Sequence, residues 1–269
     1  MDRRIIGVGC EFVQVAPAPT PAVMQIRVSP EPSVSIVSES WQVDPPLDTH
    51  PYVDLYGNRC LRLVLPQGES RFRYRARVDV PATTEPVDVA AAQLPPEALP
   101  DDVLIYTLPS RYCLPEMLTE APEQFAGGGS GHARVQAICN HVNAHLTFQY
   151  GSSVATTTSH DVHVSGFGVC RDFTHLAIAY CRALDIPARY VFGYLPQIDV
   201  APLDDPMDFA AWMEVWLGDR WWTFDPRNNM PRQGRVVIGR GRDASDVAMV
   251  TAFGQPDLTS MTVIAEAVD

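Results

Sequence analysis

Hydrophobic and polar residues alternate along the first third of the chain, in short runs that turn-forming residues separate. Alternation with a period of two, together with many β-branched residues and frequent prolines, predicts β-strands. Residues 1–98 are therefore expected to form a β-sandwich. The clearest strand-like runs are 22–28, 34–37, 61–65 and 72–78.

The pattern becomes helical in the second half of the chain. Apolar residues recur at spacings of three and four over 132–146, and again from Phe173 to Leu184. Both stretches predict helices with one apolar face. The second helix is expected to begin near Cys170 and to end before Pro187, because proline cannot continue a helix.

Strand-like runs follow this second helix at 189–195, 211–217 and 220–224. Gly218 and Asp219 join the last two runs, and a two-residue connection that begins with glycine is typical of a tight type II′ hairpin. The second half is therefore expected to pack a helix on an antiparallel sheet, which gives an α+β fold.

Proline and glycine separate the two halves. Residues 99–131 contain several prolines and end in a glycine-rich stretch at 127–131. This composition predicts a connector with little regular structure. The expected organisation is a β-sandwich domain at 1–98, a connector at 99–131 and a core domain at 132–269.

The composition limits the classes of partner. The 269 residues are 46% hydrophobic and 19% charged, as in an ordinary globular protein, and the formal net charge is −12. An acidic protein is repelled by nucleic-acid phosphates and by anionic membranes, so neither is an expected partner. The chain has no apolar run of about 18 residues and its N-terminus has no signal-peptide pattern, so the cytoplasm is the expected location.

Six cysteines are scattered along the chain, without a CxxC pair and without a metal-ligand spacing to histidines. We therefore expect neither disulfides nor a metal site. Nothing in the sequence implies a nucleotide, a flavin or another cofactor. Each cysteine is by default a small buried hydrophobe, and the one whose surroundings indicate chemistry is Cys170.

Cys170 follows Gly166 and Gly168 and is placed at the first turn of a predicted helix. Unpaired backbone amides and the positive end of the helix dipole favour a thiolate there, and they can lower a thiol pKa from near 8.5 to about 3.5–7.5. The same amides can hold an oxyanion. In the alternative interpretation, Cys170 only fills the junction between helix and sheet.

Asp225 ends the last of the three strand-like runs, directly before Pro226. An aspartate at this position can accept a hydrogen bond from an imidazole and orient it, which is the third role in a set of nucleophile, base and orienter. The alternative is an aspartate that only forms a turn before the proline.

Three segments together resemble the bacterial transglutaminase-like family in order and spacing: GVCRDFTHLAIAYCRALDIPARYVFGY, AAWMEVWLGDRWWTFDPRNN and GRVVIGRGRDASDVA. The resemblance covers residues 130–255 and implies a papain-like cysteine hydrolase fold. It also implies acyl transfer or hydrolysis at amide bonds through a thioester, with a cysteine, a histidine and an aspartate in chain order. Cys170 matches the nucleophile and Asp225 matches the orienting acid.

The matching histidine is missing from this sequence. The family's His-Ala-Trp element aligns with Ala210 and the two residues after it, and a methyl group cannot carry a proton. His160 and His163, in a predicted loop that leads into Cys170, are the candidate replacement bases. His175 follows Cys170 by five positions, about 140° around a helix, so it should point away from the thiol.

Two carboxylates lie near the vacant position, Asp208 and Glu214. Either is a poor substitute base, because a like charge raises the pKa of a neighbouring thiol. Trp212 and Glu214 share a strand face with Ala210, and these two residues are the candidate substrate contacts.

Three functional hypotheses follow. The first is a cysteine-dependent amidase or acyl transferase that acts on a peptide or protein, with Cys170 as the nucleophile. The second is a catalytically impaired pseudoenzyme that binds a peptide or protein partner in the retained cleft. The third is a structural protein in which Cys170 is a core thiol. A general base typically contributes about 10² to 10⁴ in rate, so its loss separates the first two hypotheses.

Overall fold

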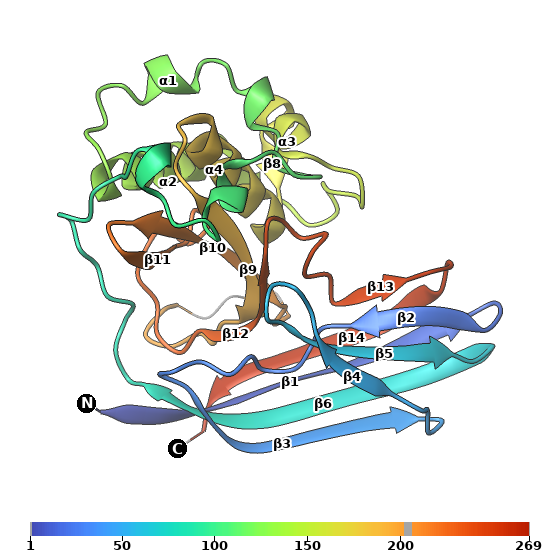
Figure 1. Ribbon diagram of the computed structural model, residues 1–269. Helices are drawn as coiled ribbons and strands as arrows, with labels where there is room; N and C mark the ends of the chain where they lie inside the picture. Colours follow the sequence, from blue (N-terminus) through green and yellow to red (C-terminus); the bar gives the residue numbers. More distant parts are fainter. Residues whose placement is uncertain (1, 202–205, 269) are drawn as a thin grey trace.

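The computed structural model describes residues 2–201 and 206–268. Figure 1 shows the helices gathered at one end of the molecule and two β-sheets at the other end, with a third sheet between them. The expected α+β fold is confirmed, since a β-sandwich is joined to helices packed on an antiparallel sheet.

The sandwich consists of two four-stranded antiparallel sheets. Alternate residues of neighbouring strands point between the sheets, as the period of two predicted, and Phe12 and Phe72 stack there with ring centroids 5.0 Å apart. The first sheet has the order β14 (Asp257–Ala267), β1 (Arg3–Ala16), β6 (Gly68–Pro81), β3 (Ser35–Asp44). The second has the order β13 (Val250–Ala252), β2 (Thr20–Met24), β5 (Arg59–Leu65), β4 (His50–Val53).

The last two strands of the chain belong to this sandwich. β14 runs antiparallel to β1, with Cys10 opposite Val263, and β13 pairs with β2. The assignment of all residues 132–269 to the core domain is therefore wrong for these strands. The partners come from opposite ends of the sequence, so no local pattern indicates their pairing.

The second half of the chain builds the third sheet. Its hairpin has the predicted connection, since Leu217 pairs with Arg220 and Gly218 has a φ of 64°. Three of its four strands begin and end within a residue of the predicted runs, whereas the fourth, β12, was not predicted. The order is β11 (Arg220–Phe224), β10 (Ala210–Leu217), β9 (Ala188–Tyr194), β12 (Val236–Gly241).

Two long helices cover one face of the third sheet. α4 (Cys170–Ala183) packs on β10, and α2 (His132–His145) packs beside α4. Asp185 follows α4 with a φ of 56°, a left-handed conformation that ends the helix. In the sequence, the segment between α2 and α4 forms α3 (Ser159–Ser165) and the short parallel strands β7 (Thr147–Phe148) and β8 (Phe167–Gly168). No helix in the described ranges is long and apolar enough to cross a lipid bilayer.

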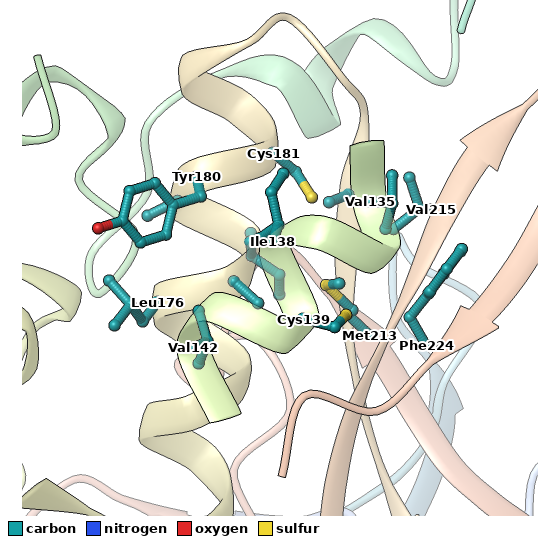
Figure 2. Close-up of a cluster of buried hydrophobic side chains, with 14 of the residues drawn as sticks. Val135, Ile138, Cys139, Val142, Leu176, Tyr180, Cys181, Met213, Val215 and Phe224 are labelled. Carbon is teal, nitrogen blue, oxygen red and sulfur yellow. The ribbon is translucent and has the colours of Figure 1, made fainter. Parts of the chain in front are cut away.

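The helices and the sheet share one apolar core (Figure 2). Ile138 of α2 and Leu176 of α4 belong to this cluster together with Met213 and Val215, alternate residues of β10. Each such side chain contributes roughly 1.5–3 kcal/mol when it is fully buried. The ring of Tyr180 lines the edge of this core, and Figure 2 shows its hydroxyl pointing away from the cluster.

The connector at 99–131 packs on the core more tightly than expected. Leu118, Ala121 and Phe125 are buried in the same cluster as α4. The prediction of little regular structure is correct in kind, because its elements have only three or four residues each. These are η2 (Leu104–Thr107), η3 (Pro115–Met117) and α1 (Ala121–Gln124), and η1 (Pro96–Ala98) precedes them.

Candidate active site

Cys170 is the first residue of α4, directly after β8. Asp172 fixes this turn, because its carboxylate accepts hydrogen bonds from the Val169 N–H at 2.8 Å and from the Ser153 hydroxyl at 3.1 Å. Gly168 is required beside it, since a Cβ there would lie 2.7 Å from the Cβ of Asp172. The local sequence therefore holds the thiol firmly at the helix end.

The Cys170 thiol is neutral near pH 7. Burial raises its pKa to about 11, and Asp208 acts in the same direction, whereas Arg227 and two backbone N–H groups lower it. The expected lowering of this pKa is wrong, because the loss of hydration outweighs the helix amides. The sulfur lies 3.9 Å from the Phe209 carbonyl oxygen, a weak hydrogen bond.

Cys170 lines a cavity of about 270 Å³, called here the cysteine cavity. It lies between the start of α4, the start of β10 and the loop after β11. A mainly apolar pocket with a few polar groups is typical of a small-ligand site. In the described part of the chain, its charged lining residues are Asp208, Arg227 and Arg232. Its apolar lining includes Phe148, Leu195, Val200, Met207, Phe209 and Met230.

Ala210, the first residue of β10, lines the cysteine cavity together with Cys170. The family resemblance led us to expect Ala210 in place of the catalytic histidine, and its methyl group can neither accept nor donate a proton. All seven histidines of the chain lie within the described ranges, and none of them lines this cavity. Cys170 therefore has no imidazole partner here.

His160 and His163 are held on a helix, not in the expected loop. Thr158 caps α3 reciprocally with Asp161, since each residue's backbone N–H donates to the other's side chain, at 2.9 and 3.3 Å. The helix turns His163 to the Tyr180 hydroxyl, 3.2 Å from its Nδ1. Neither histidine lines the cysteine cavity, so their expected place over the thiol is corrected.

His175 does not line the cysteine cavity. Its ring lies between those of Tyr112 and Tyr190, with both centroid separations 5.1 Å, and its Nε2 accepts the Ala244 N–H at 3.1 Å. Burial lowers the pKa of His175 to about 3, so this imidazole stays neutral.

Asp225, directly after β11, has every acceptor position filled. Oδ1 accepts the N–H groups of Arg227 at 3.1 Å and Asn228 at 2.9 Å. Oδ2 accepts Asn228 Nδ2 and Arg235 Nη2, both at 2.7 Å. A carboxylate offers about four lone-pair sites, so none remains for an imidazole. Burial alone would raise the pKa of Asp225, but Arg235 and Asn228 outweigh it and lower the pKa.

Arg235 links Asp225 to Glu85 and covers Trp212. Its guanidinium forms ion pairs with both carboxylates and lies 4.8 Å from the centroid of the Trp212 ring. Trp212 is only 1% exposed and lines no part of the cysteine cavity. The expectation that Trp212 contacts a substrate is therefore corrected, because its ring faces the Arg235 side of the sheet.

Glu214 is also a structural residue. It is buried between Arg189 and Arg240, at N–O distances of 2.6 and 2.8 Å. Burial alone would raise its pKa, but the two arginines lower the pKa to about 2. A carboxylate neutralised in this way is not available to a substrate, so this expected contact is corrected as well.

Arg227 and Arg232 line this site, and the sequence analysis named neither of them. The Arg227 N–H bonds Asp225, the Arg227 carbonyl oxygen accepts Asn143 Nδ2 at 2.8 Å, and its guanidinium lies 4.2 Å from the Phe148 ring centroid. The available signal was the position of Arg227, two residues after Asp225 in a loop that must lie near the cysteine.

The comparisons with known proteins agree with this arrangement. The model of the transglutaminase-like superfamily matches residues 120–226, which include Cys170, Ala210 and Asp225. The structure of a candidate cysteine protease from Cytophaga hutchinsonii superimposes with a TM-score of 0.91 at 30% sequence identity. That alignment covers 100% of this chain and 92% of the other chain.

Mycobacterial relatives match a shorter region. An uncharacterised protein of Mycobacterium leprae is 34% identical over 116 residues, which cover 39% of this chain and 41% of the relative. An uncharacterised protein of Mycobacterium tuberculosis is 32% identical over 148 residues, which cover 49% of this chain and 47% of the relative. The match thus spans less than half the length of these curated relatives. From the whole-chain likeness and the matched family model, we conclude that this chain belongs to the transglutaminase-like superfamily.

Proposed function

We propose that this protein binds peptides in the cysteine cavity and does not turn them over. The observation that supports this proposal is that none of the seven histidines lines the cysteine cavity, and the family resemblance assigns the histidine position to Ala210. Other donors also fill the acceptor positions of Asp225, so this carboxylate is not free to hold and orient an imidazole. A cavity that lacks an imidazole beside its cysteine can hold an amide without attacking it.

The size of the loss supports binding over catalysis. A general base contributes about 10² to 10⁴ in rate. With a pKa of about 11, only about one Cys170 thiol in 10⁴ is ionised at pH 7. Among the described residues, the cavity therefore has neither an imidazole nor a resting thiolate.

A second candidate function is catalysis with Asp208 as the base. Asp208 lines the same cavity, and burial raises its pKa above the usual value for aspartate. Its carboxylate is still a far weaker base than a thiolate whose parent thiol has a pKa of about 11. Each pKa unit by which the thiol exceeds the carboxyl group opposes proton transfer from Cys170 to Asp208 by about 1.4 kcal/mol. We therefore rank this function second.

The pH dependence of Cys170 alkylation tests the resting state of the site. We expect iodoacetamide to label Cys170 slowly at pH 7 and faster only above about pH 9, read by peptide mass. The other five cysteines are buried and serve as internal controls. Rapid labelling below pH 7 would show an activated thiolate and would contradict the proposal.

A turnover and binding screen separates the two candidate functions. Labelled peptides are incubated with the wild-type protein and with Cys170→Ala and Asp208→Asn variants. We expect binding without cleavage, deamidation or amine incorporation. Turnover that both substitutions abolish would establish the Asp208 mechanism, and a wild-type protein that binds no peptide would overturn the binding function.

A further inference from the structure

Among the described residues that line the cysteine cavity, positive side chains outnumber negative ones, although the protein as a whole has a net charge of −12. Two arginines, Arg227 and Arg232, line the cavity, and Asp208 is the one acidic lining residue in the described part of the chain. The cavity also receives the N-terminal end of the 14-residue helix α4, where the dipole is positive. The neutral Cys170 thiol adds no negative charge.

The guanidinium of Arg227 has hydrogen-bonding capacity to spare. Its backbone is fixed on both sides, and its plane is held against Phe148 at 4.2 Å. Within residues 2–201 and 206–268, this guanidinium forms neither a hydrogen bond nor an ion pair. An arginine carries five N–H donors, and no acceptor in the described part of the chain takes any of them.

Arg232 adds a second positive charge to the wall of the cysteine cavity. Its Nη1 donates to Asn228 Oδ1 at 3.1 Å and its Nη2 donates to the Pro196 carbonyl oxygen at 3.0 Å. Its Nε is buried without a partner among the described residues, and the side chain forms no ion pair there. No carboxylate within 2–201 and 206–268 pairs directly with the Arg232 guanidinium, and Asp225 and Glu85 act on its charge only at longer range.

The cavity wall limits what kind of anion can enter. Most of the lining is apolar, so the occupant must bring an apolar group together with its charge. A guanidinium recognises the planar carboxylate through two parallel hydrogen bonds. Asp208 in the same cavity would repel a doubly charged phosphate more strongly than a singly charged carboxylate.

We propose that Arg227 binds the carboxylate of a peptide whose neighbouring side chain is apolar. This inference rests on the proposed peptide-binding function and adds the chemical class of the ligand. The carboxylate can come from a free C-terminus or from an acidic side chain, since both present the same planar group. Arg227 is then a residue that determines specificity at this site.

The test uses fluorescent alanine-rich peptides and measures their anisotropy. One peptide ends in leucine with a free acid, the second is its C-terminal amide, and the third is an amide with an internal glutamate beside leucine. We expect the free acid or the glutamate peptide to bind about 10- to 100-fold more tightly than the plain amide. Whichever carboxylate gives the gain identifies the source.

Matched arginine variants assign the effect. Arg227→Gln should remove the preference for carboxylate, and Arg227→Lys should restore part of it, because the charge returns without the planar fork. Arg220→Gln is the control, since Arg220 also stacks on an aromatic ring, Trp222 at 4.5 Å, but lies outside the cavity. This control should keep the full preference.

The outcomes separate this inference from the proposed function. If the plain amide binds as tightly as both carboxylate peptides, the role of Arg227 is overturned and peptide binding stands. If Arg227→Gln keeps the preference, the carboxylate is bound elsewhere and the inference is overturned too. If none of the three peptides binds at any usable concentration, both proposals fail together.

Discussion

The two ends of α4 differ in whether a histidine side chain lies there, and a histidine is the general base that cysteine-dependent acyl transfer needs. At its first residue, Cys170 has no imidazole in its cavity. About 15 Å further along the helix, the Tyr180 hydroxyl lies 3.2 Å from His163, 3.4 Å from His141 and 3.5 Å from Glu120. His145 joins this group, with its ring centroid 5.3 Å from that of His163.

This difference shows that a histidine close to the cysteine in sequence need not lie close to it in the folded protein. His160 and His163 precede Cys170 by only ten and seven residues. The reciprocal cap at Thr158 makes their segment a helix, and this helix packs along α4 and presents His163 to Tyr180. A loop of the same length could have folded over the thiol.

Placing an imidazole beside Cys170 is the most direct test of this difference between the two ends of α4. We expect Ala210→His to lower the pKa of Cys170 from about 11, because an imidazolium stabilises the thiolate. The alkylation rate at pH 7 should rise about 10²-fold or more, and the measurement is iodoacetamide labelling against pH.

A matched variant adds the imidazole at the other end. Glu123→His places a fourth histidine beside His141, His145 and His163. It should leave Cys170 labelling unchanged. A folded Ala210→His protein with the wild-type labelling profile would show that residue 210 does not reach the thiol.

Removing the charge of Asp225 tests whether this residue is structural. Asp225→Asn leaves the buried Arg235 without a charged partner on that side, and we expect unfolding free energy to fall by about 3 kcal/mol. Urea denaturation measures the change, and the exposed Asp219→Asn is the control. A variant as stable as wild type would mean that Asp225 is free for another role.

Much of the fold could be predicted because local periodicity was strong. α4 and strands β9 to β11 lie within a residue of their predicted ranges. β1 was not predicted, although its residues alternate, because its partner β14 comes from the other end of the chain. The α+β class thus followed from local patterns, and the assignment of strands to domains did not.

For the candidate site too, local features could be predicted from the sequence and features that depend on packing could not. The positions of Cys170 and Asp225 at element ends followed from the sequence, whereas their electrostatic states depended on the packed structure. Burial raises the pKa of Cys170 against the helix dipole, and Arg235, ten residues after Asp225, takes one of its acceptor sites. Burial and long-range ion pairs have no signature in a short motif.

Acid should destabilise the histidine end of α4. Burial lowers the pKa of His141 and of His163, and nearby histidines add repulsion, so the fold binds fewer protons than the unfolded chain. Stability is therefore present above the unfolded pKa of about 6.5 and is lost as the pH falls below it. Thermal melts between pH 7.5 and 5 should show this trend.

The double variant His141→Gln, His163→Gln should reduce the slope of melting temperature against pH. The change should stay within about 1 kcal/mol because both rings are partly exposed. His175 is buried and neutral, so part of the slope remains. His50→Gln in the exposed strand β4 is the control. An unchanged slope in the double variant would mean that these rings do not sense the pH.

The smallest expected effect concerns the thiol itself. Cys170→Ala should change the unfolding free energy by less than about 1 kcal/mol, because the sulfur lines a cavity and donates only a weak hydrogen bond to the Phe209 carbonyl oxygen. Cys181→Ala, three turns along the same helix and fully buried, should cost more because it leaves a void in the core. Equal losses in urea denaturation would mean that Cys170 is a packing residue like Cys181, and the cavity would then have no need of a thiol.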